Sequence, residues 1–195
     1  MTENKKKGTL IVVSGPSGAG KSTLIDRFLR EDDRSSFSIS YTTRQKREHE
    51  IDGKDYYFVS KNIFEEMVRQ EGFLEWERVH SNMYGTPKDE VSKLLDTGKD
   101  IILDVDVKGA VSIREKCVNA RLIFVEPPSR EELIRRLTLR GEKEIELRMK
   151  RVDEEIAEKP LFGYTIVNDE LENAYIRFKE TITEIRRNTN GENNC

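Results

Sequence analysis

The 195-residue chain has only two cysteines, Cys117 and Cys195, and they stand far apart in the sequence. Such spacing indicates neither a metal site nor a disulfide framework, so we expect free thiols in a reducing compartment. No apolar run approaches the roughly 18–20 residues of a membrane span, and the first residues lack the apolar stretch of a signal peptide. These absences predict a soluble, cytoplasmic protein without a membrane partner.

An excess of charge of one sign is also missing, because 34 Lys and Arg stand against 37 Asp and Glu. Nonspecific nucleic-acid binding rests on a dominant basic field, so we expect no nucleic-acid partner. The charge is nevertheless uneven: residues 130–151 hold eight bases and five acids. An anionic ligand would therefore be bound by locally gathered charge.

The chain has no internal repeat and no Pro- or Gly-rich linker, and its length suits one domain. Short apolar, β-branched runs alternate with amphipathic stretches, which predicts an α/β fold with buried strands of a parallel sheet. The runs are residues 9–13, 101–105, 121–125 and 164–167. Residues 1–7 and 188–195 are polar and without periodicity, so we expect flexible tails.

Helix boundaries are indicated at three places. Ser129 to Glu132 form a capping-box pattern that opens a helix before Gly141, and Asp169 to Glu172 resemble another. Pro87 suits the first position of a helix that ends before Gly98. Between residues 37 and 79 the strands are shorter or alternate, at 56–59 and 73–79, around a charged loop at 42–55. This change predicts a small mixed β subdomain inserted in the core.

The segment after the first strand contains the eight-position phosphate-loop pattern G-x-x-x-x-G-K-[ST] at 15–22, followed by Thr23, and opens a helix expected over 21–31. These residues are Gly15, Pro16, Ser17, Gly18, Ala19, Gly20, Lys21, Ser22 and Thr23. Glycines let successive backbone N–H groups face phosphate oxygens. We expect Lys21 to reach the β- and γ-phosphates of ATP and Ser22 to bind Mg²⁺. Asp104 would be either a helix cap or an acid beside that ion. Phosphate loops serve kinases, GTPases, ATPases and motors, so the loop alone leaves the reaction open.

Further segments resemble the guanylate kinase family. They are SYTTRQKREHEIDGKDYYFV at 40–59, Glu75-Trp76, Tyr84-Gly85-Thr86, DVDVKG at 104–109, Pro127-Pro128-Ser129, the arginine-rich segment and Asn168-Asp169. The resemblance covers nearly the whole chain between its tails. It implies that ATP phosphorylates GMP to give ADP and GDP, in purine nucleotide metabolism.

The resemblance also implies an architecture: a phosphate-loop core with a central parallel five-stranded sheet flanked by helices, an inserted mixed β subdomain that binds GMP, and a mobile helical lid. The corresponding ranges are 8–36, 88–129 and 160–187 for the core, about 37–87 for the GMP-binding subdomain and about 130–159 for the lid. Both a monomer and a homodimer are compatible with it.

Matched residue by residue, the resemblance assigns a role to most of the polar residues. The GMP phosphate would be held by Arg44, Arg47, Tyr56 and Tyr84. The guanine base would be contacted by Ser40, Glu75 and Thr86, with Asp106 beside the nucleotide. The lid arginines that reach the reacting phosphates would be Arg136, Arg140 and Arg151. With Lys21 and Arg44 they form the expected catalytic set, while Glu50 would order the GMP side.

The chemistry of these residues supports the assignment. Guanidinium groups bind phosphate oxygens bidentately, and phenol hydroxyls donate to them. Guanine presents N1–H and N2–H together, which one carboxylate at Glu75 can accept, whereas adenine presents an acceptor at N1. Taken alone, Arg44 and Arg47 would belong to a solvated loop, and Glu75 on an alternating strand would face water.

The sequence departs from the usual family pattern at three places. Lys46 stands where Pro is common, Glu48-His49 replaces a small residue and Gly, and Lys108 replaces Gln. These changes bear on GMP affinity more than on the reaction. Two rival functions remain open: a non-catalytic guanylate-kinase-like module that binds peptides, and a phosphate-loop kinase for another small phosphorylated substrate.

Overall fold

The larger of two sheets runs through the centre of the molecule. The computed structural model describes residues 7–79, 81–142 and 144–189. Five strands lie in the order β2-β7-β1-β8-β9, and all neighbouring pairs are parallel. They are β1 (Leu10–Ser14), β2 (Ser35–Phe37), β7 (Asp100–Asp104), β8 (Arg121–Glu126) and β9 (Tyr164–Val167). The predicted α/β fold with a five-stranded parallel sheet is confirmed.

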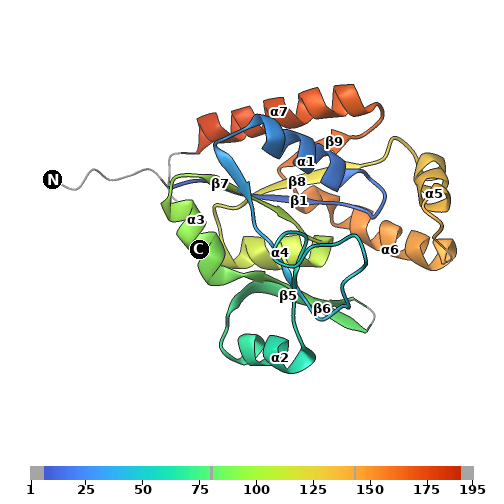
Figure 1. Cartoon of the computed structure of the whole chain (residues 1–195). Helices are drawn as coiled ribbons and strands as arrows, with labels where there is room; N and C mark the ends of the chain where they lie inside the picture. Colours follow the sequence, from blue (N-terminus) through green and yellow to red (C-terminus); the bar gives the residue numbers. More distant parts are fainter. Residues whose placement is uncertain (1–6, 80, 143, 190–195) are drawn as a thin grey trace.

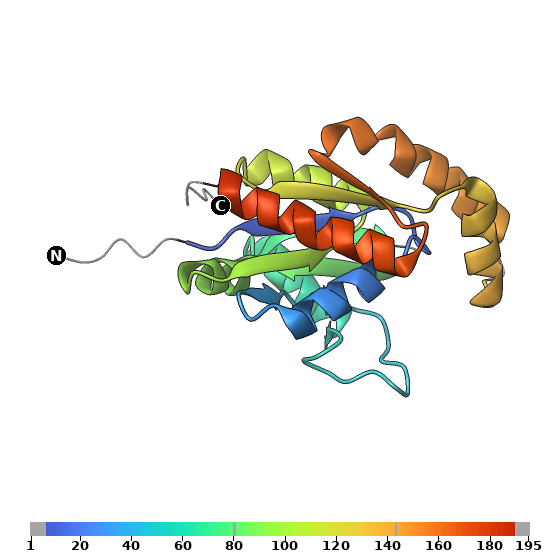
Figure 2. The same cartoon turned by 90° about the horizontal axis from the view of Figure 1, so that it is seen from above.

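Helices cover both faces of this sheet (Figure 1). Helices α1 (Lys21–Glu31) and α7 (Leu171–Asn188) lie side by side on one face (Figure 2), and α3 (Lys88–Asp96) and α4 (Val107–Lys116) cover the other. Alternate residues of β1 serve the two layers: Ile11 and Val13 pack with α1 and α7, and Leu10 and Val12 with α3 and α4. Burial on both faces explains why the strand reads as a continuous apolar run.

The second sheet is mixed and has the order β4-β3-β6-β5. Its strands are β3 (Tyr41–Thr42), β4 (Tyr57–Phe58), β5 (Phe73–Val79) and β6 (Asn82–Pro87), and α2 (Lys61–Arg69) packs on it. Phe64 of α2 stacks on Phe73 with 4.6 Å between the ring centroids. Leu74 of β5 belongs to the same apolar cluster as Val107 and Ala110 of α4, so this sheet is anchored to the main core.

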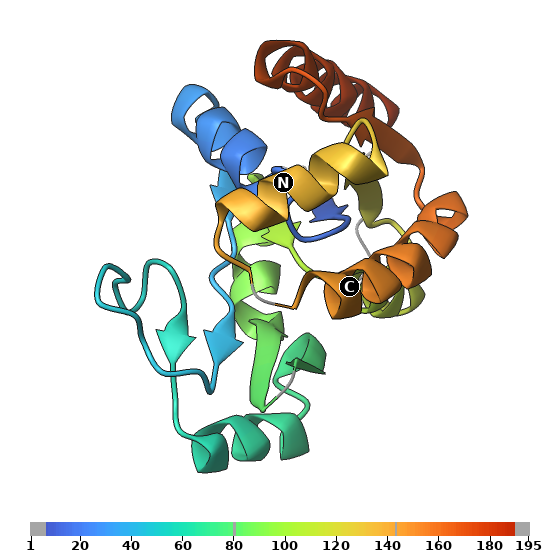
Figure 3. The ribbon, with the colours of Figure 1, turned by 90° about the vertical axis from the view of Figure 1, so that its right-hand side faces the viewer.

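Helices α5 (Arg130–Leu139) and α6 (Ile145–Ala157) form a pair with a small apolar core of their own, and a 3₁₀ turn, η1 (Lys159–Leu161), follows. Figure 3 faces this pair and shows the smaller sheet and α2 below it. The Ser129 hydroxyl accepts a hydrogen bond from the Glu132 N–H at 3.2 Å, and Gly141 follows the helix with a φ of 75°. The predicted cap at Ser129 is thus confirmed.

Two predicted helix starts differ in detail. Pro87 is the N-cap of α3 rather than its first residue, because β6 continues through Pro87. The side chain of Asp169 accepts from the N–H of Glu170, and α7 begins at Leu171 without a side-chain cap. Pairing of Pro87 with Phe73 in the β5–β6 ladder keeps Pro87 extended, so α3 starts one residue later.

The ends of the chain differ from the sequence prediction where they are described. Lys7 forms an ion pair with Asp96 at 2.7 Å. Asn188 is the last residue of α7, and Thr189 is buried with its hydroxyl donating to the Ile185 carbonyl at 2.7 Å. The remainder of both predicted tails lies outside the described residues.

Cys117 is fully buried and is not a free thiol, so that expectation is wrong for it. Cys195 lies outside the described residues. Within the described part of the chain, no helix is long and apolar enough to cross a membrane.

Candidate active site

The phosphate loop joins β1 to α1, and its glycines meet two physical requirements. Gly15, Gly18 and Gly20 have φ values of 129°, 91° and 92°, which side chains disfavour. A Cβ atom at Gly15 would lie 2.1 Å from the Val125 carbonyl oxygen, and one at Gly20 would lie 2.2 Å from Asn168 Nδ2. The loop therefore keeps its inward curve only with glycine at these positions, as the motif predicts.

Lys21, Ser22 and Asp104 meet beside this loop. Lys21 Nζ donates to the Gly15 carbonyl at 2.6 Å and lies 4.0 Å from Asp104 Oδ1, and the Ser22 hydroxyl donates to Asp104 Oδ2 at 3.1 Å. Burial raises the pKa of Asp104, and the Lys21 charge opposes that rise. The cap of α4 is Asp106, so the helix-cap interpretation of Asp104 is wrong.

Asn168 connects the phosphate loop to α5. The side-chain amide of Asn168 donates to the Ala19 carbonyl at 2.7 Å, and its backbone carbonyl accepts from Arg136 Nη2 at 3.0 Å. Arg136 also pairs with Glu132 at 2.8 Å. Arg136 is thus linked to the phosphate loop through Asn168. In the sequence, Asn168 is noted only as part of the family resemblance and is given no role in the site.

Glu50 organises the charged loop between β3 and β4. Its two carboxylate oxygens accept from Arg44 at 2.7 and 2.9 Å, and Oε2 also accepts from the Arg47 N–H at 2.8 Å. Lys46 Nζ donates to the Glu50 carbonyl at 2.8 Å. The Arg44 hydrogen bonds lower the pKa of Glu50 to about 2. This loop is an ordered cluster rather than a freely solvated segment.

Two tyrosines complete the surroundings of Arg44. Its guanidinium carbon lies 5.5 Å from the centroid of the Tyr56 ring, and the Tyr56 and Tyr84 rings are 5.9 Å apart. Burial raises the pKa of Tyr56, and the charge of Asp104 raises it further. The Tyr56 hydroxyl is therefore a neutral hydrogen-bond donor within electrostatic range of the phosphate loop.

Glu75 and Thr86 form a buried polar pair on neighbouring strands. They are opposite each other in the β5–β6 ladder, and the Thr86 hydroxyl donates to Glu75 Oε1 at 2.5 Å. Glu75 is only 6% exposed, contrary to the solvent-facing position that strand alternation alone suggests. Burial, assisted by the charge of Asp106, raises the pKa of Glu75 to about 7. Asp106 caps α4 by accepting from the Gly109 N–H at 2.7 Å.

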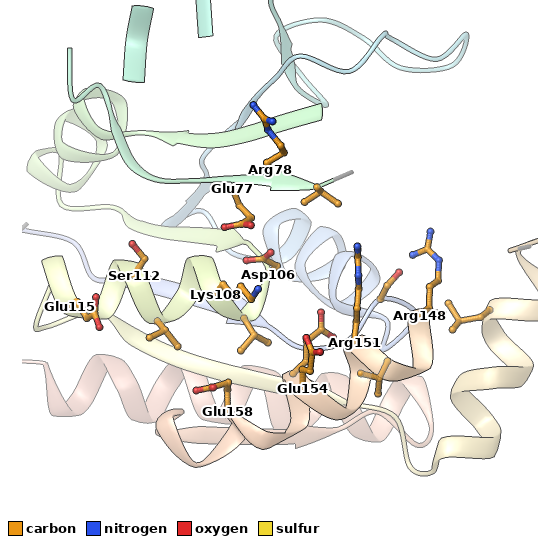
Figure 4. A pocket seen from close by; sticks show the side chains of 17 residues that line it. Glu77, Arg78, Asp106, Lys108, Ser112, Glu115, Arg148, Arg151, Glu154 and Glu158 are labelled. Carbon is orange, nitrogen blue, oxygen red and sulfur yellow. The ribbon is translucent and has the colours of Figure 1, made fainter. Parts of the chain in front are cut away.

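A cavity of about 730 Å³ opens between β5, α4 and α6. Figure 4 shows Glu77 and Asp106 on one side of it, with Arg148 and Arg151 projecting from α6 on the other. Ser17 of the phosphate loop also lines the cavity. Arg148 is a residue that the sequence analysis missed, because the arginine-rich segment does not reveal which of its members share a helix face.

The structure does not bring every predicted residue into these clusters. Arg47 joins the Glu50 network through its backbone N–H, and its side chain is exposed. Arg140 is the exposed C-cap of α5. Ser40 accepts a backbone hydrogen bond from Tyr57 at 3.0 Å, and its side chain is half-buried.

A phosphate loop on a parallel sheet, with a second polar pocket and a helical pair nearby, is the arrangement of small phosphate-loop kinases. The guanylate kinase family model matches residues 7–185. The chain therefore belongs to the guanylate kinase family.

Individual relatives agree with this membership. The guanylate kinase of Caldanaerobacter subterraneus subsp. tengcongensis is 42% identical over 91% of this chain and 88% of its own length. That of Clostridioides difficile is 45% identical over 85% of this chain and 82% of its own. The crystal structure of guanylate kinase from Anaplasma phagocytophilum superimposes with a TM-score of 0.79 at 30% identity, covering 97% of this chain and 91% of that chain. The resemblance inferred from the sequence is confirmed.

Proposed function

We propose that this chain transfers the γ-phosphoryl group of ATP to GMP, giving ADP and GDP. The observation that carries the proposal is the combination of a phosphate loop with the buried Glu75–Thr86 pair. A carboxylate in such a pocket is complementary to the adjacent N1–H and N2–H donors of guanine. Neither a peptide-binding module nor a kinase for an unrelated phosphorylated substrate requires both features.

On the ATP side, residues 15–23 bind the phosphates through backbone N–H groups. Lys21 lies against the Gly15 carbonyl, and it would exchange that neutral acceptor for a phosphate oxygen when ATP enters. Arg136, held by Asn168, would extend the positive surface over the transferred group.

Ser22 and Asp104 fit a magnesium ion, because Mg²⁺ prefers oxygen ligands and is bound in kinases by one or two protein groups together with substrate phosphates and water. When bound, the ion would neutralise charge on the β- and γ-phosphates. The two side chains are already adjacent, so no backbone rearrangement is needed to hold it.

On the GMP side, Arg44 and Arg47 would bind the phosphate with the hydroxyls of Tyr56 and Tyr84. Glu50 keeps Arg44 in place through two hydrogen bonds, so the arginine loses little conformational freedom when the phosphate arrives. The bound phosphate is the nucleophile. Its oxygen forms a bond to the γ-phosphorus as the bond to the β-phosphate oxygen of ATP breaks, and a dianionic nucleophile requires no general base.

Exclusion of water would fall to α5 and α6. Arg151 and Arg148 line the cavity from α6, and Arg140 lies at the end of α5. Movement of this pair toward the smaller sheet would bring the arginines to the reacting phosphates and would prevent hydrolysis of ATP. Residues 130–159 would thus act as the lid, and 37–87 as the GMP-binding subdomain.

The proposal places the protein in the cytoplasm as a monomer or a homodimer, without a membrane partner. The balance of 34 basic and 37 acidic residues supports the absence of a nucleic-acid partner. A coupled assay of ADP formation with ATP, Mg²⁺ and each of GMP, AMP, CMP and UMP tests the reaction. Turnover is expected with GMP alone. Comparable turnover with AMP would contradict the guanine assignment, and GMP binding without turnover would favour the peptide-binding alternative.

A further inference from the structure

Gly109 occupies the first turn of α4, between the carboxylates of Glu75 and Asp106. A Cβ atom at this position would lie 3.0 Å from Glu75 Oε2, 3.3 Å from Glu75 Cδ and 3.2 Å from Asp106 Oδ1. Both carboxylates thus lie close to the position that a side chain at Gly109 would occupy.

The backbone conformation does not explain this glycine. Gly109 lies within a regular helix and is not among the glycines with positive φ. Glycine inside a helix is unfavourable relative to alanine. A steric reason remains, and the atoms closest to the missing Cβ belong to the two carboxylates.

A Cβ atom here would require the carboxylates to move by a few tenths of an ångström, and each is held by a hydrogen bond. Glu75 Oε1 accepts from the Thr86 hydroxyl, which fixes the group from the strand side. Asp106 Oδ1 accepts from the Gly109 N–H as the helix cap. An added methyl group would therefore shift the Glu75 carboxylate by a few tenths of an ångström, because two of its atoms lie nearest to the added carbon.

We propose that Gly109 determines specificity for guanine: its missing side chain lets Glu75 approach the start of α4 beside Asp106, where the Glu75 carboxylate is placed to accept from the N1–H and N2–H donors of the base. Gly109 is a positioning residue that acts through Glu75. This inference rests on the guanine-binding role of Glu75 in the proposed function.

The test is Gly109→Ala, with Gly163→Ala as the matched control because a Cβ at Gly163 meets no atom within 4 Å. In Gly109→Ala, the Kd for GMP measured by calorimetry should rise about tenfold, as for the loss of one hydrogen bond to a charged group. The KM for ATP should stay unchanged, and a thermal unfolding curve should show that the variant is folded at the assay temperature. IMP lacks the exocyclic amine, so the preference for GMP over IMP should narrow.

A double-mutant cycle separates the inference from the function on which it rests. In an E75A background, Gly109→Ala should cause no further loss of GMP affinity, and this background also removes the steric conflict. An additive loss there, or an unchanged Kd and GMP/IMP ratio in Gly109→Ala, would overturn the role of Gly109. If Glu75→Gln itself leaves GMP affinity unchanged, the guanine assignment of Glu75 fails instead.

Discussion

Lowering the pH from 8 to 6 should weaken GMP binding through Glu75. Burial raises the pKa of this carboxyl from 4.5 to about 7 in the empty protein. The proposed contact requires the ionised form, because both guanine groups that face it are donors. Affinity is therefore retained above pH 7 and is lost as the pH falls through that value.

The size of the effect follows from the ionised fraction. With a pKa of about 7, roughly nine tenths of Glu75 is ionised at pH 8, half at pH 7 and one tenth at pH 6. The apparent Kd for GMP should rise about tenfold from this group alone. The phosphate of GMP, with a second pKa of about 6, adds about a further twofold. The carboxyl of Glu50, with a pKa of about 2, stays ionised throughout and adds nothing.

Isothermal titration calorimetry measures both the affinity and the protons exchanged. In buffers of different ionisation enthalpy at pH 7, GMP binding should release about half a proton from Glu75. Glu75→Gln is the control: it should bind GMP more weakly and keep only the twofold phosphate dependence. The same pH profile in both proteins, or proton uptake by the wild type, would refute the reasoning.

Three further results are expected. Lys21→Ala should lower kcat by roughly 10²–10³-fold through loss of charge stabilisation on the transferred group, with a GMP Kd unchanged by fluorescence titration; a matching loss of GMP affinity would contradict its ATP-side role. Glu50→Gln should raise the KM for GMP roughly tenfold by freeing Arg44, with an unchanged KM for ATP, whereas Glu184→Gln at an exposed position of α7 should change neither. Glu75→Gln should stabilise the empty protein by at most about 3 kcal/mol at pH 8. Because folding raises the pKa of Glu75, the wild type has its full stability below pH 4.5 and loses part of it as the pH rises through about 7, whereas the Gln variant does not. Thermal unfolding at pH 8 and pH 5 measures this gain, and a gain that does not shrink at pH 5 would contradict the cause.

The sequence predicted those parts of the site that local geometry determines. The phosphate loop is contiguous, and its positive-φ glycines leave few alternatives, so its position and the bounds of α1 agree with the prediction. Strand β5 likewise spans residues 73–79, as its alternation indicates. In both cases the pattern and the physical requirement lie within the same short segment.

The remainder depends on contacts between distant segments. Glu75 is buried because α4 covers the start of β5, where the ladder has an irregularity between Phe73 and Glu75. Strand alternation contains no information about that helix. Whether Asp104 caps the following helix depends on where that helix starts, which is uncertain by a residue or two from sequence; α4 starts at Val107 and its cap is Asp106.

Glu50 and Glu75 are the same residue type in the same small sheet region, yet their pKa values move in opposite directions, to about 2 and about 7. Glu50 is paired with Arg44 and stays charged, so it can hold the arginine whether or not GMP is present. Glu75 is buried against a neutral hydroxyl, and its charge becomes favourable when a ligand supplies two adjacent N–H groups. A base without those donors would leave a buried carboxylate unsatisfied, which costs far more than a lost surface contact. Under the proposed function, selection of guanine would therefore follow from the burial of the Glu75 carboxylate beside the site of the base.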